Sequence, residues 1–259
     1  MIDIMTFTEQ ISHQGWVKIS GVYPEKILQD VLLDMERLEA IYTPIQKDAG
    51  VYEHTVNAYH HTIVVCRSML SLLDNNPIHP YLEAYFDGQY ILNTMGASVI
   101  KPKTPIYTTN IHRDVRSFTN GFPLLINTLI CLDDSTIENG ATWMLSGSHK
   151  QPNRPEAEYF YAHAERVEAK KGDVLIFDGN IWHAAGTNNS TNVRRIITPI
   201  YTKPFCKQQL DYPRAFGYDF AHNISPYLKQ VLGYNARTPT RLDEFYQPTH
   251  KRFYQNSQG

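Results

Sequence analysis

A histidine and an aspartate lie two positions apart in the stretch YTTNIHRDVRSF, residues 107–118. The residues before them alternate in the manner of a β-strand, and alternate residues of a strand share one face. Asn110, His112 and Asp114 are therefore expected to project together. An imidazole and a carboxylate can both bind a metal ion, but two ligands do not hold a metal firmly in water. In a β-protein such a pair is more often a polar strand face, so a metal site needs a third ligand from elsewhere.

Among the eleven histidines, His183 has the setting that such a third ligand requires. It follows an apolar strand and a short crossing in GDVLIFDGNIWHAAGTNN (172–189), and the small residues Ala184, Ala185 and Gly186 leave room for a group to approach it. Two neutral imidazoles and one carboxylate form the facial arrangement that suits non-haem iron(II), with coordination positions left open. The spacing therefore raises the hypothesis of an iron site.

Arg194 and Arg195 lie eleven and twelve residues after His183, at the start of the apolar run RRIITPIYT. An arginine that faces a barrel interior needs an anionic partner, because an unpaired buried charge is expensive. A dicarboxylate ligand would supply one, since guanidinium binds carboxylate through two parallel hydrogen bonds. The alternative is a surface position for both arginines, paired with local acids. Isoleucine occurs on both faces of this run, so the hydrophobic pattern does not choose the inward arginine.

The elements that must position these residues change character along the chain. The range 24–42 places apolar residues at helical spacing, and 61–76 is expected to form a second, mostly buried helix. Six strands after two helices predict a mainly β protein with flanking helices, in which helices cover the outside of a β-sandwich or barrel. The tail returns to helix at 225–234. The six expected strands are 90–100, 106–114, 123–134, 140–145, 172–179 and 194–202.

Composition predicts a single domain over residues 1–259, with a helical part at about 1–85, a β core at about 90–205 and a helical tail. The hydrophobic content of 42% supports a sizeable core. The net charge of −2 gives no basic field for nucleic acid or an anionic membrane, and no apolar run approaches the roughly 20 residues of a membrane span. Three scattered cysteines and an N-terminus without a basic segment predict a cytoplasmic location.

Four blocks stand out by their order and spacing: HRD (112–114), LDDSTIENGATWMLSGSHK (132–150), GDVLIFDGNIWHAAGTNNSTNVRR (172–195) and LGYNARTPTRLDEFYQP (232–248). Together they resemble the phytanoyl-CoA dioxygenase family of iron(II)- and 2-oxoglutarate-dependent oxygenases, over most of the chain. Ser146 departs from the proline that is usual in the family, but this position lies in a turn. The resemblance implies a double-stranded β-helix, which is a jelly-roll or cupin-like barrel with helices against one sheet.

The resemblance also implies roles for individual residues. His112, Asp114 and His183 would be the iron(II) ligands. The family spacing after His183 selects Arg194, and not Arg195, as the residue that binds the distal carboxylate of 2-oxoglutarate.

Further candidates follow from the same resemblance. Thr142 is similar to a hydroxyl that assists the arginine, and Asn110 is a candidate donor to the carboxylate beside the iron. Asn127 is a second candidate for that donor, although ordinary polar lining of a barrel explains it equally well. His149 is expected to be a structural corner residue and not a ligand.

The family reaction uses iron(II) as cofactor, with 2-oxoglutarate and O2 as cosubstrates. Related halogenases replace the carboxylate ligand by a small residue to admit chloride. The presence of Asp114 therefore favours hydroxylation, and Asp178 is the next candidate for the carboxylate. Desaturation, cyclisation, epimerisation and endoperoxidation use the same ligands and stay open. A catalytically inactive jelly-roll binding module and a zinc or manganese protein are the alternatives from other classes.

The resemblance implies a small-molecule substrate, a secondary metabolite or an amino-acid derivative. Tyr59 and His60, in AYHH (58–61), are weak candidates for its pocket, and surface positions would explain them equally well. The sequence does not determine the oligomeric state.

Overall fold

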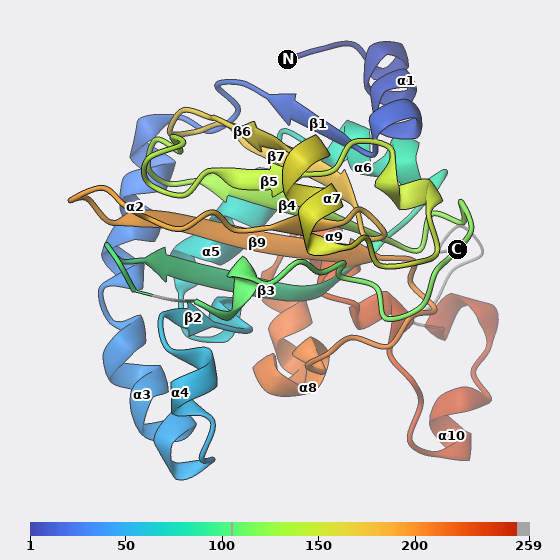
Figure 1. Ribbon diagram of the computed structural model, residues 1–259. Helices are drawn as coiled ribbons and strands as arrows, with labels where there is room; N and C mark the ends of the chain where they lie inside the picture. Colours follow the sequence, from blue (N-terminus) through green and yellow to red (C-terminus); the bar gives the residue numbers. More distant parts are fainter. Residues whose placement is uncertain (105, 253–259) are drawn as a thin grey trace.

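Two antiparallel sheets form the centre of the protein, and helices flank them (Figure 1). This computed structural model describes residues 1–104 and 106–252. The six-stranded sheet has the order β1-β7-β4-β9-β3-β2, and the three-stranded sheet has the order β6-β5-β8. The strands are β1 (Trp16–Ile19), β2 (Ala58–Tyr59), β3 (Ile91–Ile100), β4 (Leu125–Cys131), β5 (Thr142–Met144), β6 (Glu165–Val167), β7 (Val174–Asp178), β8 (His183–Ala184) and β9 (Arg194–Thr202).

Helices occupy the N-terminal third and the C-terminal tail, and α7 lies between strands β5 and β6 in the chain. The α-helices are α1 (Ile4–Gln14), α2 (Glu25–Met35), α3 (Leu38–Asp48), α4 (Tyr52–Thr55), α5 (Arg67–Asp74), α6 (His79–Phe86), α7 (Ala157–His163), α8 (Tyr212–Phe216), α9 (Pro226–Val231) and α10 (Leu242–Phe245). The short 3-10 helices are η1 (Thr62–Val64), η2 (Tyr107–Thr109), η3 (Ser148–Lys150), η4 (Tyr218–Asn223), η5 (Tyr234–Ala236) and η6 (Thr249–Lys251).

Five of the expected strands are confirmed as β3, β4, β5, β7 and β9, and the expected strand at 106–114 is wrong. That segment begins with η2, where the Thr109 hydroxyl donates to the Ile106 carbonyl (2.9 Å) and the Asn110 amide donates to the Tyr107 carbonyl (3.1 Å). Side-chain hydrogen bonds of this local kind compete with a strand ladder. In the described part of the segment 106–114, the β-pairing is a single isolated bridge between His112 and His183.

The two expected N-terminal helices are each interrupted. The range 24–42 contains α2 and α3, which are separated at residues 36–37, and 61–76 contains η1 and α5, separated by the extended residue Cys66. Asp34 explains part of the first break, because its carboxylate accepts hydrogen bonds from the backbone N–H (2.9 Å) and hydroxyl (2.6 Å) of Ser68. These bonds connect the end of α2 to the first turn of α5. The expected tail helix at 225–234 is confirmed in its first part as α9, which Ser225 caps.

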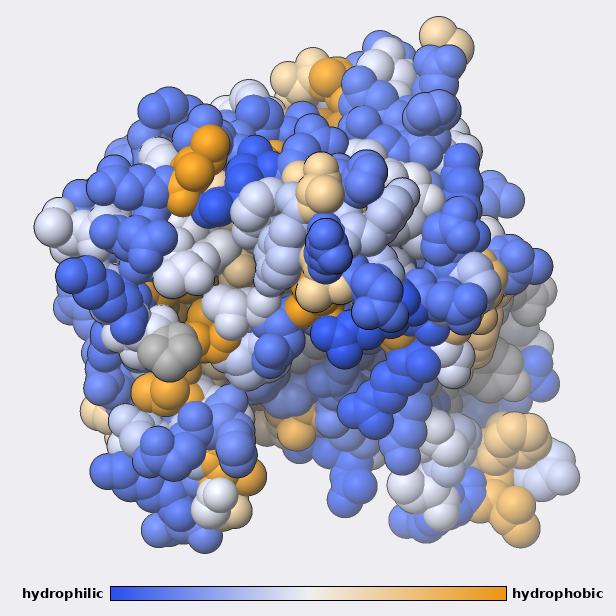
Figure 2. Space-filling model, viewed as in Figure 1, coloured by the Kyte–Doolittle hydropathy of each residue, from blue (hydrophilic) through white to orange (hydrophobic). Residues whose placement is uncertain are grey.

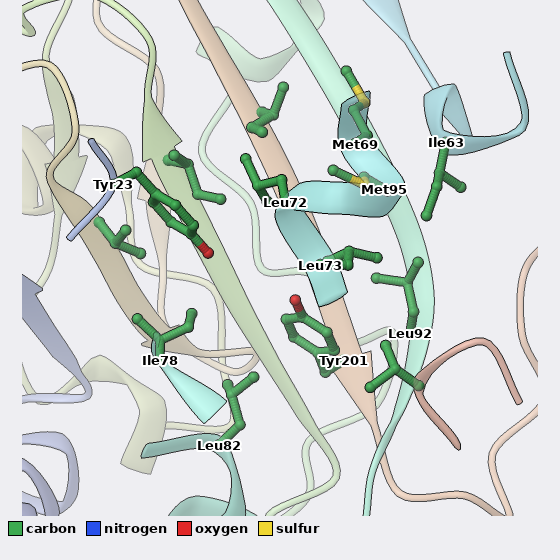
Figure 3. Close-up of a cluster of buried hydrophobic side chains, with 14 of the residues drawn as sticks. Tyr23, Ile63, Met69, Leu72, Leu73, Ile78, Leu82, Leu92, Met95 and Tyr201 are labelled. Carbon is green, nitrogen blue, oxygen red and sulfur yellow. The ribbon is translucent and has the colours of Figure 1, made fainter. Parts of the chain in front are cut away.

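The largest core lies between the six-stranded sheet and the helices, where side chains of α5 and α6 meet those of β3 and β9 (Figure 3). A second cluster contains side chains from both sheets, including Leu129 and Met144. On β9, Ile197 and Tyr201 belong to the first cluster and Ile196 to the second. Alternation along β9 therefore gives this strand one face toward the helices and one face toward the smaller sheet.

The visible surface is mostly hydrophilic, with separate hydrophobic groups scattered over it (Figure 2). Within residues 1–104 and 106–252, no helix is long and apolar enough to cross a membrane.

Candidate metal centre

The segment that carries His112 and Asp114 is held in place by backbone hydrogen bonds to the chain around His183. The His112 N–H donates to the His183 carbonyl (3.0 Å), and the His183 N–H donates to the His112 carbonyl (2.9 Å). The Asp114 N–H donates to the Gly179 carbonyl (3.0 Å). In turn, β8 pairs with β5, and Met144 is the partner of His183. Backbone pairing thus positions the segment although it does not form a strand.

The side chains of His112, Asp114 and His183 converge, with one donor atom of each lying within 4.8 Å of the others. The Nε2 atoms of His112 and His183 lie 3.8 and 4.0 Å from the two carboxylate oxygens of Asp114. Each Nδ1 lies near a backbone carbonyl two residues earlier, at 2.7 Å for His112 and 3.1 Å for His183. Hydrogen bonds of this kind fix the tautomer that leaves Nε2 free for a metal.

Electrostatics keep the buried histidine in the form that binds metals. Burial, together with the neighbouring His112, lowers the pKa of His183 to about 4, and the Asp114 carboxylate only partly opposes this shift. The His183 imidazole is therefore neutral at pH 7. Asp114 is oriented by Asn127 of β4, whose side-chain amide donates to Oδ2 at 2.7 Å. Asn127 thus contacts the carboxylate of the candidate ligand.

Arg194 and Arg195 have opposite environments on β9. Arg194 is 0% exposed, and its Nη1 donates to the Ser135 hydroxyl (2.8 Å). Its Nε and Nη2 atoms have no hydrogen-bond partner among residues 1–104 and 106–252. Arg195 is partly exposed and makes a two-pronged contact with Asp133 at 2.7 and 2.8 Å. Burial lowers the pKa of Arg194 to about 10. Two buried guanidinium nitrogens of the inward arginine thus donate to no acceptor in the described part of the chain, which is costly unless a ligand pairs with them.

A cavity of about 200 Å³ opens beside the candidate ligands. Ile196 and Thr198, which share the inward face of β9 with Arg194, belong to its wall. Thr142 and Asn127 also line it, as do Tyr59 and His60. Arg194 itself is not among the described residues that line this cavity. The other sequence candidates for cofactor and substrate contacts surround this one space, with one exception.

Asn110 is that exception, and the expectation that it faces the iron beside His112 is corrected. Its side chain is exposed and its amide donates to the Tyr107 carbonyl (2.9 Å), because η2 replaces the strand that would have placed it inward. His149 lies at a corner as expected: its Nε2 is 3.2 Å from the Ser12 carbonyl, and its ring packs against Gly15. Asp178 accepts hydrogen bonds from Tyr85 (2.7 Å) and belongs to a different pocket.

Sequence reasoning missed several residues of the cavity wall, including Tyr107, Thr94, Ser98 and Gln209. Ser98 meets the cavity because it pairs with Ile196 across β3 and β9, and this pairing belongs to the tertiary fold. No signal in the sequence indicated Gln209, which follows the last strand and meets the cavity only through the tertiary fold.

Comparison with protein families gives the class to which this fold and site belong. The family model of phytanoyl-CoA dioxygenase (PhyH) matches residues 11–196, which include all three candidate ligands and Arg194. The chain therefore belongs to the phytanoyl-CoA dioxygenase family.

Individual relatives agree with this assignment. An uncharacterized protein of Mycobacterium tuberculosis is 35% identical over 154 residues, which cover 60% of this chain and 56% of that protein. The match thus spans little more than half the length of the mycobacterial relative. The iron/alpha-ketoglutarate-dependent dioxygenase AusU of Aspergillus calidoustus is 24% identical over 273 residues, covering 96% of this chain and 87% of that protein.

Solved structures share the fold. The non-heme alpha-ketoglutarate-dependent epimerase SnoN from nogalamycin biosynthesis superposes with a TM-score of 0.62 at 18% identity, over 77% of this chain and 80% of that one. AviO1 from Streptomyces viridochromogenes gives 0.61 at 22% identity, over 79% of this chain and 96% of that one.

Proposed function

We propose that the protein is an iron(II)- and 2-oxoglutarate-dependent dioxygenase that oxidises a small organic molecule. The observation that carries the proposal is the convergence of two imidazoles and a carboxylate on one cavity, next to a strand whose inward face begins with a buried, incompletely paired arginine. This donor set suits iron(II), and the free N–H groups of the arginine suit a carboxylate. The residues present thus fit both the metal and the cosubstrate.

In this proposal His112, Asp114 and His183 hold the metal. Arg194 pairs with the distal carboxylate of 2-oxoglutarate, and the Thr142 hydroxyl lies on the cavity wall to assist that contact. When bound, iron with 2-oxoglutarate and O2 supplies the oxidising power, and the cosubstrate leaves as succinate and carbon dioxide.

Two further residues prepare the site for this chemistry. The hydrogen bond from Asn127 holds the Asp114 carboxylate toward the metal position and so limits its rotation. The apolar ring of Phe177 packs against the ring of His183 at 4.9 Å between centroids and helps to exclude water from the ligands. The protein thus orients the metal ligands and excludes water from them, while the metal and cosubstrates supply the oxidising chemistry.

Hydroxylation is the proposed outcome because the carboxylate ligand is present. Epimerisation uses the same ligands, and the epimerase SnoN shares the fold. The named fungal relative is a dioxygenase, which supports oxidation of a small molecule such as a secondary metabolite. We further propose that the two sheets form a double-stranded β-helix and that residues 1–259 constitute one domain.

Oxygen uptake tests the proposal. The protein is loaded with iron(II) without air, 2-oxoglutarate and air-saturated buffer are added, and oxygen consumption and succinate are measured. We expect both above the metal-free control, and His183→Ala should abolish them. A protein that binds iron(II) and 2-oxoglutarate yet forms no succinate, with or without a panel of candidate substrates, would be a binding module.

A further inference from the structure

The cavity wall includes an aromatic pair that the metal and cosubstrate do not use. Tyr107 and His60 lie 47 positions apart in the sequence, yet the Tyr107 hydroxyl and His60 Nε2 are 3.0 Å apart. Their rings stack with centroids 6.1 Å apart and planes inclined by 28°. Tyr107 is 44% exposed, which places the pair where the cavity meets solvent. A substrate that approaches the metal centre therefore passes the pair.

Unusual backbone conformations hold one half of this pair. Asn57 and His61 flank the short strand β2 and its neighbour His60, and both have positive φ angles, 63° and 55°. Such conformations are costly for residues with side chains and persist where the surroundings enforce them, often at functional sites. Here the Val99 N–H donates to the Asn57 carbonyl (2.9 Å), and the Tyr42 hydroxyl donates to the His60 carbonyl (2.7 Å). The position of His60 over the cavity is thus fixed by strained but well-anchored backbone.

The cavity wall offers hydrogen bonds but almost no charge. Among the described residues that line it, Asp114 is the only one with an acidic or permanently basic side chain, and it belongs to the metal cluster. Burial lowers the pKa of His60 and raises the pKa of Tyr59 to about 12, so both are neutral at pH 7. Outside the ligand set, the other polar groups of the wall are hydroxyls, among them that of Thr94, and the amides of Asn127 and Gln209.

A charged substrate would lose hydration on entering this space without gaining a partner of opposite charge from the described wall residues outside the ligand set. That loss is large, whereas a neutral hydroxyl or carbonyl needs only one or two hydrogen bonds to offset its desolvation. Because His60 Nε2 and the Tyr107 hydroxyl are hydrogen-bonded to each other, the tautomer of His60 decides whether the Tyr107 hydroxyl is left to donate or to accept at the mouth. An amino acid, with its ammonium and carboxylate groups, would leave two charges without a partner.

We propose that His60 and Tyr107 form a substrate-binding pair that selects an uncharged molecule carrying a hydroxyl or carbonyl oxygen. The inference rests on the proposed oxygenase function and narrows its substrate class: neutral oxygenated compounds fit, and amino acids or other charged compounds do not.

Three probes of one shape test this selection: benzyl alcohol, benzoate and benzylamine, which are neutral, anionic and cationic at pH 7. Their binding is measured by saturation-transfer NMR on the protein loaded with zinc(II) and 2-oxoglutarate, which does not turn over. Replacing zinc(II) by manganese(II) then shows, by line broadening, whether a probe lies beside the metal. Calorimetric titration of the same samples measures the binding of the metal and of 2-oxoglutarate, and so tests the proposed function separately. The binding of the three probes is then measured again on protein that contains neither the metal nor 2-oxoglutarate.

We expect benzyl alcohol to bind at least about fivefold more tightly than either charged probe and to be broadened by manganese(II). His60→Phe and Tyr107→Phe should each weaken its binding about fivefold, the effect of one neutral hydrogen bond, with the charged probes unchanged. The chain offers a matched control, because Tyr159 and His163 form a second stacked pair on α7 with centroids 4.1 Å apart. His163→Phe and Tyr159→Phe should leave every probe unaffected.

Three results would overturn the inference. A charged probe that binds as tightly as benzyl alcohol would remove the selection for neutral molecules. If both His60→Phe and Tyr107→Phe bind benzyl alcohol as tightly as the wild type, the pair is not its binding site. The same conclusion follows if the wild-type protein does not bind benzyl alcohol. Failure of metal and 2-oxoglutarate to bind would instead contradict the proposed function, whatever the probes show.

Discussion

Replacing Arg194 by methionine should change cosubstrate affinity and protein stability in opposite directions. Arg194 is 0% exposed, and among the described residues its guanidinium makes a single hydrogen bond, from Nη1 to Ser135. Methionine fills a similar volume without charge. The substitution therefore removes a carboxylate-binding group and, at the same time, a buried charge that has no opposite partner.

The two effects can be estimated from the structure. Loss of a two-pronged contact to a charged ligand should cost about 2–5 kcal/mol, which weakens 2-oxoglutarate binding roughly thirtyfold to several-thousandfold. Burial lowers the Arg194 pKa from 12.5 to about 10, and at about 1.36 kcal/mol per pH unit this corresponds to roughly 3 kcal/mol of destabilisation at every pH below 10. After about 1 kcal/mol for the lost Ser135 hydrogen bond, the ligand-free variant should gain about 2 kcal/mol.

Two measurements on each variant test these opposite effects on 2-oxoglutarate affinity and on stability. Titration of 2-oxoglutarate into the anaerobic iron(II) protein gives its affinity from the charge-transfer absorbance, and thermal melting without 2-oxoglutarate gives stability. Arg195→Met is the matched control: its partly exposed pair with Asp133 should contribute under about 1 kcal/mol and leave affinity unchanged. The reasoning fails if Arg195→Met loses affinity and Arg194→Met does not, or if Arg194→Met melts far below the wild type with normal affinity.

Four other predictions concern the candidate metal centre. His112→Ala or His183→Ala should abolish iron(II) binding, while circular dichroism and thermal melting show an intact fold. The fold should persist because an open catalytic metal site contributes less to folding than a closed structural one. Normal turnover in either variant would show that the replaced residue is not a ligand. Asp114→Gly should lose hydroxylation and admit chloride, and wild-type succinate formation would place the carboxylate ligand elsewhere. Asn127→Ala should weaken iron(II) binding about 10- to 100-fold in a chelator competition, and an unchanged constant would deny Asn127 its orienting role. Because burial lowers the His183 pKa from 6.5 to about 4, the metal-free protein should lose stability in urea as pH falls from 6.5 to 4, and His183→Asn should flatten that slope.

The convergence of the three candidate ligands could be predicted because the family resemblance specified their residue types and spacing, whatever the local backbone does. His112 and Asp114 converge although the strand that was expected to align them is absent. A bridge to His183, 71 positions later, holds the segment instead, and no local pattern reports such a distant pairing. Asn110 was wrong for the same reason, since its placement depended only on strand alternation. The predicted convergence, which depended on the resemblance, was thus unaffected by the error in local structure, whereas the prediction for Asn110, which depended on strand geometry, was not.

The inward arginine shows what a local pattern leaves undecided. Isoleucine occurs on both faces of β9, so hydrophobicity alone allowed either Arg194 or Arg195 to face inward. The structure separates them through Asp133, which follows β4 and accepts from both the backbone and the side chain of Arg195. Since β4 and β9 are neighbours in the sheet, that pairing depends on topology and not on the residues near the arginines.

The substrate side of the cavity was least accessible to sequence reasoning, and the cause is physical. A metal demands particular donor atoms, whereas a neutral organic substrate can be held by hydroxyls, amides and rings that also occur throughout any protein surface. His60 was a candidate and Tyr107 was not, because only the fold brings η2 against the segment after β2. The substrate side of the cavity is identified by a property of the whole wall. Among the described residues, almost no charged side chains line this space beside the candidate metal centre. That property exists only once distant segments are assembled, and it therefore has to be tested by the charge of a probe as well as by changing one residue.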